Sequence, residues 1–568
     1  MKKTKLIYTA LAAALLVGSC KQEPIKLTAA EVPVITTPTK GTIDVTKFIA
    51  VGNSFVAGMQ ASSLYNESQA NSLPKILARQ FESVGGSATF NQPDINSVNG
   101  FNPINSVLPT VILGRLVLFD PDGPTILDAT GKAISGARSV APFPAKYPGA
   151  PAVTCPSAVP ATPALPAPYN TSDFPTAFDA SKRAALNNFG VPLIYLAQAL
   201  TPATGGPASP ANPAYSPFYN RFASSASPDG LNGSRIITDA KAAVGSFYLM
   251  WLGFDDVLLY AATGATNDGQ PSPPAGTFPM TSTAAFTGQL NAALNDPSIG
   301  LLTGTTFKGV VGNIPDFTSL PYFFTVPWNT ITIDAATATT LTTNLATGYN
   351  GFLNAMVGAG VITAAERDSR LLTYAAGKVG VLMVDEGLTD LTAAMNANGA
   401  GALVPYARAR QAKSTDLIPL AAGSILGTCF GGSASAVFGV SYPVSDQYVL
   451  TPTETQAILT RTAEFNTAIS NALSSTTNNA STRLALADVR KAYADLVTSK
   501  ILPFNGVSIS PSFAPPTGAY SEDGLHPNSR GYAYTANVFI KAINAKFGAT
   551  IPEASLASYK GTSLPINP

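Results

Sequence analysis

The sequence predicts an α/β protein in which helices cover both faces of a parallel sheet. Short apolar runs, rich in branched residues, alternate along the chain with segments of helical periodicity. The apolar runs are continuous, which is typical of strands that are buried on both faces. Polar residues directly follow three of these runs, and sites in parallel sheets form at the carboxyl ends of the strands. We therefore expect a functional site at that edge of the sheet.

Five segments are expected to form buried strands. KFIAVGNSF (residues 47–55) ends in a Gly-Asn turn, and GSFYLMWLGFDD (residues 245–256) opens with an apolar run suited to the centre of a sheet. The other three are FKGVVGNIPDF (residues 307–317), VGVLMVDE (residues 379–386) and RLALADV (residues 483–489). The polar groups GNS, GFDD and GNIPD stand where the first three runs end.

Three segments are expected to form helices. Residues 71–86 carry apolar side chains at helical spacing and end in two glycines. Thr451 and Glu454 have the spacing of a capping box, in which each residue bonds the backbone of the other at the start of a helix. A last amphipathic segment begins shortly after His526. These helices alternate with the predicted strands, as the α/β class requires.

Long stretches between these elements lack a regular pattern. Residues 141–168 are rich in proline and alanine, and proline cannot donate a backbone hydrogen bond, so we expect neither helix nor inner strand there. We assign irregular insertions at about residues 90–180 and 262–440 to one discontinuous domain spanning residues 45–548. Residues 549–568 are expected to form a C-terminal tail.

The N-terminus has the pattern of a bacterial export signal. A basic start, MKKTK, precedes an apolar run that is shorter than the roughly 20 residues needed to span a bilayer. The run ends in VGSC, which resembles the lipobox of bacterial lipoproteins. That resemblance implies removal of residues 1–19, lipidation of Cys20 and a flexible tether over residues 20–44. It implies an exported protein anchored by lipid to the bacterial cell envelope; we expect the outer membrane, with the inner membrane left open. An ordinary signal peptide with a chance cysteine is the alternative.

Composition excludes several functions. The net charge is +1 and charged residues make up 12% of the chain, so there is no basic surface for nucleic acid. A single histidine and no CxxC motif argue against a Cys/His zinc site. Cys155 and Cys429 remain as a possible disulfide in an exported protein. No segment after the signal is a long uninterrupted apolar run, so we expect a soluble body whose oligomeric state stays open.

The only histidine lies in SEDGLHPNSRGYAY (residues 521–534), three positions after Asp523. Side chains at this spacing can meet on one turn, and the following proline keeps His526 out of the helix. A carboxylate that holds a histidine tautomer is the rear half of a Ser-His-Asp triad. Ser54, in the turn after the first predicted strand, is the candidate nucleophile.

Four segments together resemble the SGNH hydrolases, also called GDSL esterases and lipases. VGNSFVAG is similar to the first block of that family, NNFGVP (residues 187–192) to the second, GFDD to the third and DGLHP to the last. The α/β-hydrolases share the order Ser, Asp, His, but they carry a G-x-S-x-G elbow that VGNSFV lacks. Because the blocks span residues 54–526, they imply one domain, although length alone suggests three or four.

The resemblance implies a three-layer α/β/α, flavodoxin-like fold and a hydrolase that needs no metal or cofactor. It assigns catalysis to Ser54, Asp523 and His526, and an oxyanion hole to Ser54, Gly190 and Asp255. Two positions depart from the family pattern. Asn53 stands where an aspartate is usual, as a neutral near-isostere. Asp255 stands where the family has an asparagine.

Asp255 is the more serious departure, because an ionised carboxylate cannot donate a hydrogen bond to an oxyanion. Burial beside Asp256 could raise its pKa so that it stays protonated and donates as asparagine would. Alternatively, it points elsewhere, and the backbone N–H groups of Ser54 and Gly190 form the hole. In a third case the site is catalytically weak.

Two functions therefore remain. The first is a serine esterase or lipase that hydrolyses lipid, short-chain or acetyl-glycan esters through an acyl-enzyme. The second is a degenerate surface lipoprotein that binds glycan or lipid without turnover. Asp255 is the feature that separates the two.

Overall fold

The computed structural model describes residues 37–103, 112–119, 143–146, 178–209, 211–226, 229–266, 279–504 and 506–564. The chain divides into two units, Met1–Thr37 and Pro38–Pro568, and the second contains the helices and strands of the fold. The predicted signal peptide, Cys20, most of the tether and Cys155 lie outside the described residues. Among the described residues, no helix is both long and apolar enough to cross a bilayer.

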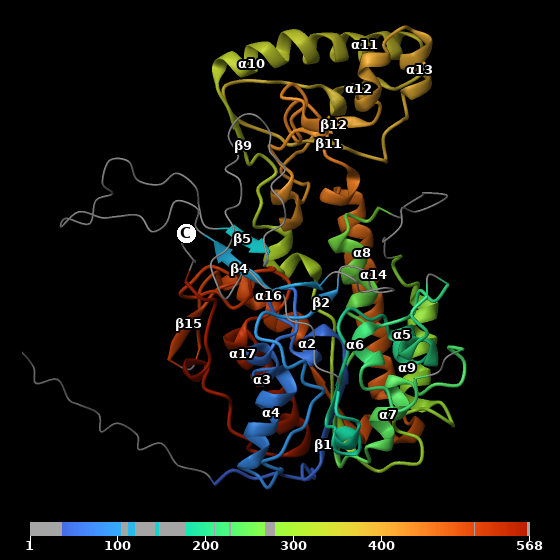
Figure 1. The fold of residues 1–568 in the computed structure, drawn as a ribbon, viewed down its shortest axis with the longest axis vertical. Coiled ribbons are helices and arrows are strands. Elements are labelled where there is room, and N and C mark those ends of the chain that lie inside the picture. The colour runs from blue at the N-terminus through green and yellow to red at the C-terminus, as the bar shows by residue number, and fades with distance from the viewer. Residues whose placement is uncertain are drawn as a thin grey trace, which may run out of the picture. The chain divides into compact units, whose positions relative to one another are not determined.

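A five-stranded sheet forms the centre of the second unit, and each of its neighbouring strands pairs in parallel (Figure 1). Numbered along the chain, these strands lie in the order 2-1-3-4-5, which is a doubly wound α/β order. Gly52 pairs with both Gly190 and Trp251, so the carboxyl ends of three strands lie at the same edge. In spatial order the strands are β13 (Leu484–Ala487), β8 (Lys308–Gly312), β7 (Phe247–Trp251), β1 (Phe48–Gly52) and β6 (Asn188–Gly190).

Helices flank this sheet in two groups (Figure 1). One group packs around α17 (Ser529–Phe547), with α4 (Leu73–Glu82) and α16 (Val489–Ser499). The other packs around α14 (Pro452–Ser474), with α8 (Asp255–Ala262) and α9 (Thr283–Asn295). Further helices are α2 (Ser54–Ala57), α3 (Asn66–Ala70), α5 (Leu196–Ala199), α6 (Pro217–Asn220), α7 (Ile236–Ala242), α10 (Ala335–Leu341), α11 (Thr347–Gly358), α12 (Ala364–Arg370), α13 (Thr392–Ala397) and α15 (Ala480–Arg483).

Most predicted elements of the sheet layers are confirmed. Four of the five expected strands lie in the central sheet, as β1, β7, β8 and β13, and the three expected helices are α4, α14 and α17. At the start of α14, Glu454 Oε2 accepts a hydrogen bond from the backbone N–H of Thr451 at 2.7 Å, which confirms the capping box. The short strand β6 was not predicted.

The segment 379–386 was expected to form a buried strand, but it does not join the parallel sheet. Its run is interrupted at Gly380, where a Cβ would collide with the carbonyl of Ala412. The chain instead forms two short strands, each paired antiparallel with another segment. These ladders are β10 (Gly377–Val379) with β9 (Ile331–Ile333), and β11 (Leu382–Val384) with β12 (Ala409–Gln411).

The insertions also differ from the predicted boundaries. Residues 262–440 include β8 and α9, which belong to the sheet and its helices, so this stretch is not one insertion. Helices α10 to α13 gather around a separate small core centred on Tyr349, Leu353 and Met395 (Figure 1). Other short ladders pair β2 (Asn102–Pro103) with β3 (Ile112–Leu113), β4 (Leu116–Phe119) with β5 (Phe143–Lys146), and β14 (Leu502–Phe504) with β15 (Val507–Ile509).

Both ends of the predicted domain extend further than expected. The N–H of Thr42 donates to the carbonyl of Phe547 at 3.0 Å, so the folded body begins before residue 45. Asn537 Nδ2 donates to the carbonyl of Ala554 at 2.9 Å, which fastens the predicted tail to α17. Cys429 is buried and disulfide-bonded, and its predicted pairing with Cys155 stays a prediction.

Candidate active site

Ser54 lies at the carboxyl edge of the sheet, as the sequence predicts. It is the first residue of α2, directly after β1 and the turn formed by Gly52 and Asn53. A side chain at position 52 would collide with Val56 and with the carbonyl of Trp251, so the turn requires glycine. Asn53 Oδ1 accepts from the N–H of Phe55 at 3.2 Å and fixes the turn. The Ser54 side chain is fully buried.

Asp523 and His526 form the predicted pair. His526 Nδ1 lies 2.8 Å from Asp523 Oδ2, and both side chains are buried. The turn before α17 brings them together, because the carbonyl of His526 accepts from the N–H of Ser521 at 2.8 Å. Gly524 occupies the left-handed region of this turn, with φ of +67°. An ionised Asp523 therefore selects the tautomer that carries hydrogen on Nδ1 and leaves Nε2 as an acceptor.

The hydrogen bonds of Asp523 keep it ionised. Burial raises the pKa of this carboxyl, but His526 and the backbone donors outweigh burial and bring the pKa below its usual value. Five donors point at its two oxygens. They are Ser521 Oγ, Leu525 N and His526 N on Oδ1, and Ser62 N and His526 Nδ1 on Oδ2.

His526 lies next to the Ser54 turn. Its ring centroid is 5.1 Å from that of Phe55, the residue after Ser54. Within the described part of the chain, no hydrogen bond joins Ser54 Oγ to the imidazole. Catalytic hydrogen bonds of this kind often shorten only when substrate is bound. The structure therefore brings the three predicted triad residues into one neighbourhood without closing the Ser-His bond.

The loop after β6 supplies the hydrogen bonds that the sequence did not predict. The N–H of Leu193 donates to Ser54 Oγ at 3.0 Å, and the next N–H, of Ile194, donates to Asp255 Oδ2 at 3.1 Å. Farther along, the N–H of Leu196 donates to Asp256 Oδ2 at 2.8 Å. One loop thus links the turn after β1 to the two carboxyl groups after β7.

Gly190 differs from its predicted role. Its N–H donates to Asn188 Oδ1 at 2.9 Å, within the same strand, and so has another partner. A Cβ at this position would collide with the backbone of Val56 and Ala57, so the glycine allows β6 to pack against α2. The N–H that the structure places at Ser54 Oγ belongs to Leu193.

Leu193 has a backbone conformation that glycine would favour. Its φ is +56°, which costs other residues about 1–2 kcal/mol. Leu371 is a matched control, because the two leucines are 39% and 38% exposed and Leu371 has φ of −52°. We expect Leu193→Gly to destabilise the fold by about 1–2 kcal/mol less than Leu371→Gly in urea unfolding. Equal losses would contradict the left-handed assignment.

Asp255 and Asp256 open α8 and are both buried. Burial and the neighbouring Asp256 raise the pKa of Asp255 well above its usual value. Burial also raises the pKa of Asp256, to about 7, against the hydrogen bonds from Leu196 and Thr281. Asn53 lies close enough to Asp255 to lower its pKa slightly, although Asn53 Nδ2 makes no hydrogen bond of ordinary geometry. These shifts favour a protonated Asp255.

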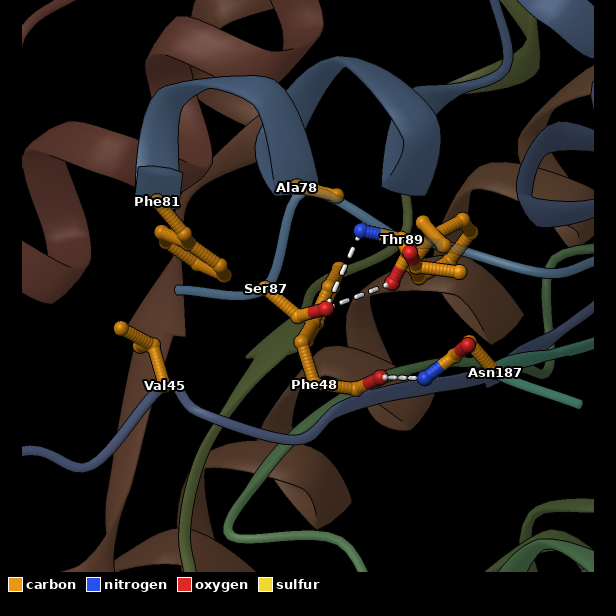
Figure 2. A pocket seen from close by; sticks show the side chains of 8 residues that line it. Val45, Phe48, Ala78, Phe81, Ser87, Thr89 and Asn187 are labelled. Carbon is orange, nitrogen blue, oxygen red and sulfur yellow. Dashed lines mark hydrogen bonds between the residues drawn. The ribbon is translucent and has the colours of Figure 1, made fainter. Parts of the chain in front are cut away.

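A small cavity elsewhere along β1 is separate from this site. It measures about 10 Å³, enough for about one water molecule. Figure 2 shows it between Phe48, the first residue of β1, and Ala78 and Phe81 of α4. Ser54 follows the opposite end of the strand, so this cavity is no substrate pocket for the candidate triad.

The fold and this neighbourhood define the chain as a doubly wound α/β protein with a serine and a buried Asp-His pair at the carboxyl edge of its sheet. No protein-family model, curated protein or solved structure matches the chain.

Proposed function

We propose that the protein is a serine esterase of the SGNH hydrolase type. The observation that carries the proposal is the buried pair of Asp523 and His526 beside the turn that holds Ser54. Ser54 follows β1 and Asp255 follows β7, and these adjacent strands form the switch point where doubly wound sheets place their sites.

In this mechanism, His526 Nε2 removes the proton of Ser54 Oγ while the hydroxyl oxygen attacks the carbonyl carbon of an ester. The tetrahedral intermediate expels the alcohol, which takes the proton from His526. Water then attacks the acyl-enzyme with His526 again acting as the base, and His526 returns that proton to Ser54 Oγ as the carboxylic acid leaves. Asp523 stabilises the imidazolium that forms in each half of the reaction.

The backbone N–H groups of Ser54 and Leu193 are the proposed oxyanion donors. Leu193 N–H already lies 3.0 Å from Ser54 Oγ, within reach of an oxyanion that forms beside it. The first N–H groups of a helix have no partner within the helix, so that of Ser54 is available. A protonated Asp255 is a third possible donor, or else it serves to hold the loop through Ile194.

The proposed substrates are carboxylic esters, either lipid, short-chain or acetyl-glycan. Ser54 is buried, but Leu193, whose N–H donates to Ser54 Oγ, is 39% exposed. The nucleophile therefore lies directly beneath a surface residue. We propose that the protein acts at the bacterial cell envelope, held to the membrane through lipidated Cys20.

A fluorophosphonate probe tests the proposal, because it forms a covalent bond only with an activated serine. We expect mass spectrometry to find the adduct on Ser54, together with hydrolysis of a short-chain p-nitrophenyl ester. Ser54→Ala should abolish both. Ser63→Ala is the matched control, since Ser63 is buried nearby in the sequence and its hydroxyl has no hydrogen-bond partner. An unlabelled Ser54 and no turnover between pH 5 and 9 would contradict an esterase.

The full burial of Ser54 and the carboxyl group of Asp255 favour a second function, a surface lipoprotein that binds glycan or lipid without turnover. Under that function, the protein would bind an ester substrate or its glycan with equal affinity before and after Ser54→Ala, and no acyl-enzyme would form. The probe experiment therefore separates the two functions.

A further inference from the structure

Three carboxylates from separate segments meet beside the start of α14. Glu386 follows β11, Asp446 lies in the 3₁₀ turn Asp446–Tyr448, and Glu454 is in the first turn of α14. One oxygen of each carboxyl lies within 4.8 Å of the others. The capping box predicted the place of Glu454, but no sequence pattern connects it to Glu386, which lies 68 positions earlier.

Glu454 has a buried oxygen that its capping role does not use. The side chain is 3% exposed. Its Oε2 accepts from both the N–H and the hydroxyl of Thr451 at 2.7 Å, whereas its Oε1 is buried and has no hydrogen-bond partner. Oε2 of Glu386 is also buried without a partner. Buried acceptors of this kind are rare in native proteins unless a donor or an ion lies between them.

The surrounding bases are engaged elsewhere. Arg410 binds Asp385 at 2.5 Å and Asp416 at 2.7 Å. Arg408 pairs with Asp390 at 3.7 Å and reaches the backbone carbonyl of Glu386 at 3.5 Å. Among the described residues, no lysine or arginine makes an ion pair with any carboxylate of the cluster. Arg408 lies near enough for its charge to help lower the pKa of Glu386, but this one base faces three carboxyl groups.

We propose that Glu386, Asp446 and Glu454 bind a divalent cation of the size of Ca²⁺. Calcium takes oxygen ligands at about 2.3–2.6 Å, so its ligand oxygens lie up to about 5 Å apart. Magnesium binds at about 2.0–2.1 Å and requires a tighter octahedron, which the observed spacing fits less well. The burial of Glu454 makes a preformed corner of the site, and water would complete the coordination.

The cation has a structural consequence within the second unit. Val384 and Met383 of β11 belong to the small ladders of the inserted region, whereas Ile458 and Phe465 of α14 belong to the main core. Glu386 lies two residues beyond β11, and Glu454 is part of α14. A cation bound by both residues would link the β11–β12 ladder to α14, which packs in the helix layer of the central sheet.

Protons are the competing way to neutralise the cluster. Burial and the negative charge of Glu386 raise the pKa of Asp446 to about 10 and that of Glu454 to about 8. The two explanations differ in what stabilises the protein, because shared protons respond to pH alone, whereas a bound cation responds to its own concentration.

Calorimetric titration and thermal unfolding test the proposal on the purified protein after treatment with EGTA. We expect CaCl₂ to bind with a Kd below about 1 mM, as extracellular calcium sites do, and to raise Tm in proportion to the logarithm of its concentration. MgCl₂ should bind at least about tenfold more weakly. These readouts do not depend on esterase activity.

Glu386→Gln should weaken calcium binding at least tenfold and remove the Tm shift. Asp446→Asn should do the same and provides a second variant if the first fails to fold. Glu464→Gln is the control, because it removes an exposed carboxylate from α14, the helix that carries Glu454. It should leave both the calcium affinity and the Tm shift unchanged. A Tm that responds to pH but not to CaCl₂, or calcium binding that survives in both cluster variants, would overturn the proposal.

Discussion

Asp523→Asn is expected to lower the rate of ester hydrolysis by about 10⁴-fold, as the corresponding change does in serine proteases with this triad. The asparagine side chain has one carbonyl oxygen and one NH₂ group, so one of the two oxygen positions that now accept hydrogen bonds would instead donate them. An amide facing His526 Nδ1 favours the tautomer with hydrogen on Nε2. That imidazole cannot accept the proton of Ser54. The measurement is kcat/KM for a short-chain p-nitrophenyl ester.

The same substitution should also destabilise the fold, because five donors converge on this buried carboxylate. Asp239→Asn controls for that loss. Asp239 is also buried, and it accepts from Tyr219, Ser224 and Ser234, in a different part of the molecule. We expect both variants to lose stability and only Asp523→Asn to lose activity. A variant Asp523→Asn that retained a tenth of the activity would contradict a role for the carboxylate in selecting the tautomer.

The pH dependence of stability follows from the lowered pKa of Asp523. A carboxyl that is more acidic when folded releases its proton more readily in the native state, so it stabilises the fold above its unfolded pKa of about 3.9. That contribution disappears as the pH falls through the folded pKa. Asp523 therefore contributes to stability throughout the neutral range in which an esterase would operate.

The sequence predicts those parts of the site that depend on local patterns. Four central strands are continuous apolar runs because both faces of the sheet are covered, and Ser54 follows one of them directly. Asp523 and His526 are three residues apart, so one turn is enough to bring them together. For the same reason, Thr451 and Glu454 could be assigned as a capping box from their spacing.

Other features depend on tertiary contacts that leave no local pattern. Strand β6 has three residues and begins with asparagine, so its run is too short to show periodicity. Leu193 occupies a left-handed conformation that its side chain disfavours, and only its contact with Ser54 reveals its position. The segment 379–386 has the composition of a buried strand, but composition does not specify its partner. The carboxylate cluster joins residues 386, 446 and 454, which no sequence spacing connects.

Asp255→Asn is expected to stabilise the protein increasingly as the pH rises. The folded pKa of Asp255 lies well above its usual value, so between the unfolded pKa of about 3.9 and the folded pKa the native state holds a proton that the unfolded state has released. Wild-type stability then falls with rising pH by up to about 1.4 kcal/mol per pH unit from this group. Asparagine does not titrate, so the variant lacks this slope. Urea unfolding between pH 5 and 9 measures the difference.

Activity should change in the same direction. As the pH rises, Asp255 of the wild type loses its proton and places negative charge near the oxyanion that forms at Ser54, whereas asparagine at this position stays neutral and can donate. The variant should therefore be at least as active as the wild type at pH 6 and keep its activity to higher pH. Asp256→Asn is the contrasting variant, because Asp256 accepts hydrogen bonds from Leu196, the first residue of α5, and from Thr281, shortly before α9. It should reduce the slope of stability up to about pH 7, where its own pKa lies. Because it also removes a charge that raises the pKa of Asp255, it should move the upper limit of activity to lower pH, opposite to the effect of Asp255→Asn. Identical stability slopes in the wild type and Asp255→Asn would mean that Asp255 is ionised in the folded protein, and an oxyanion hole that includes it would then be ruled out.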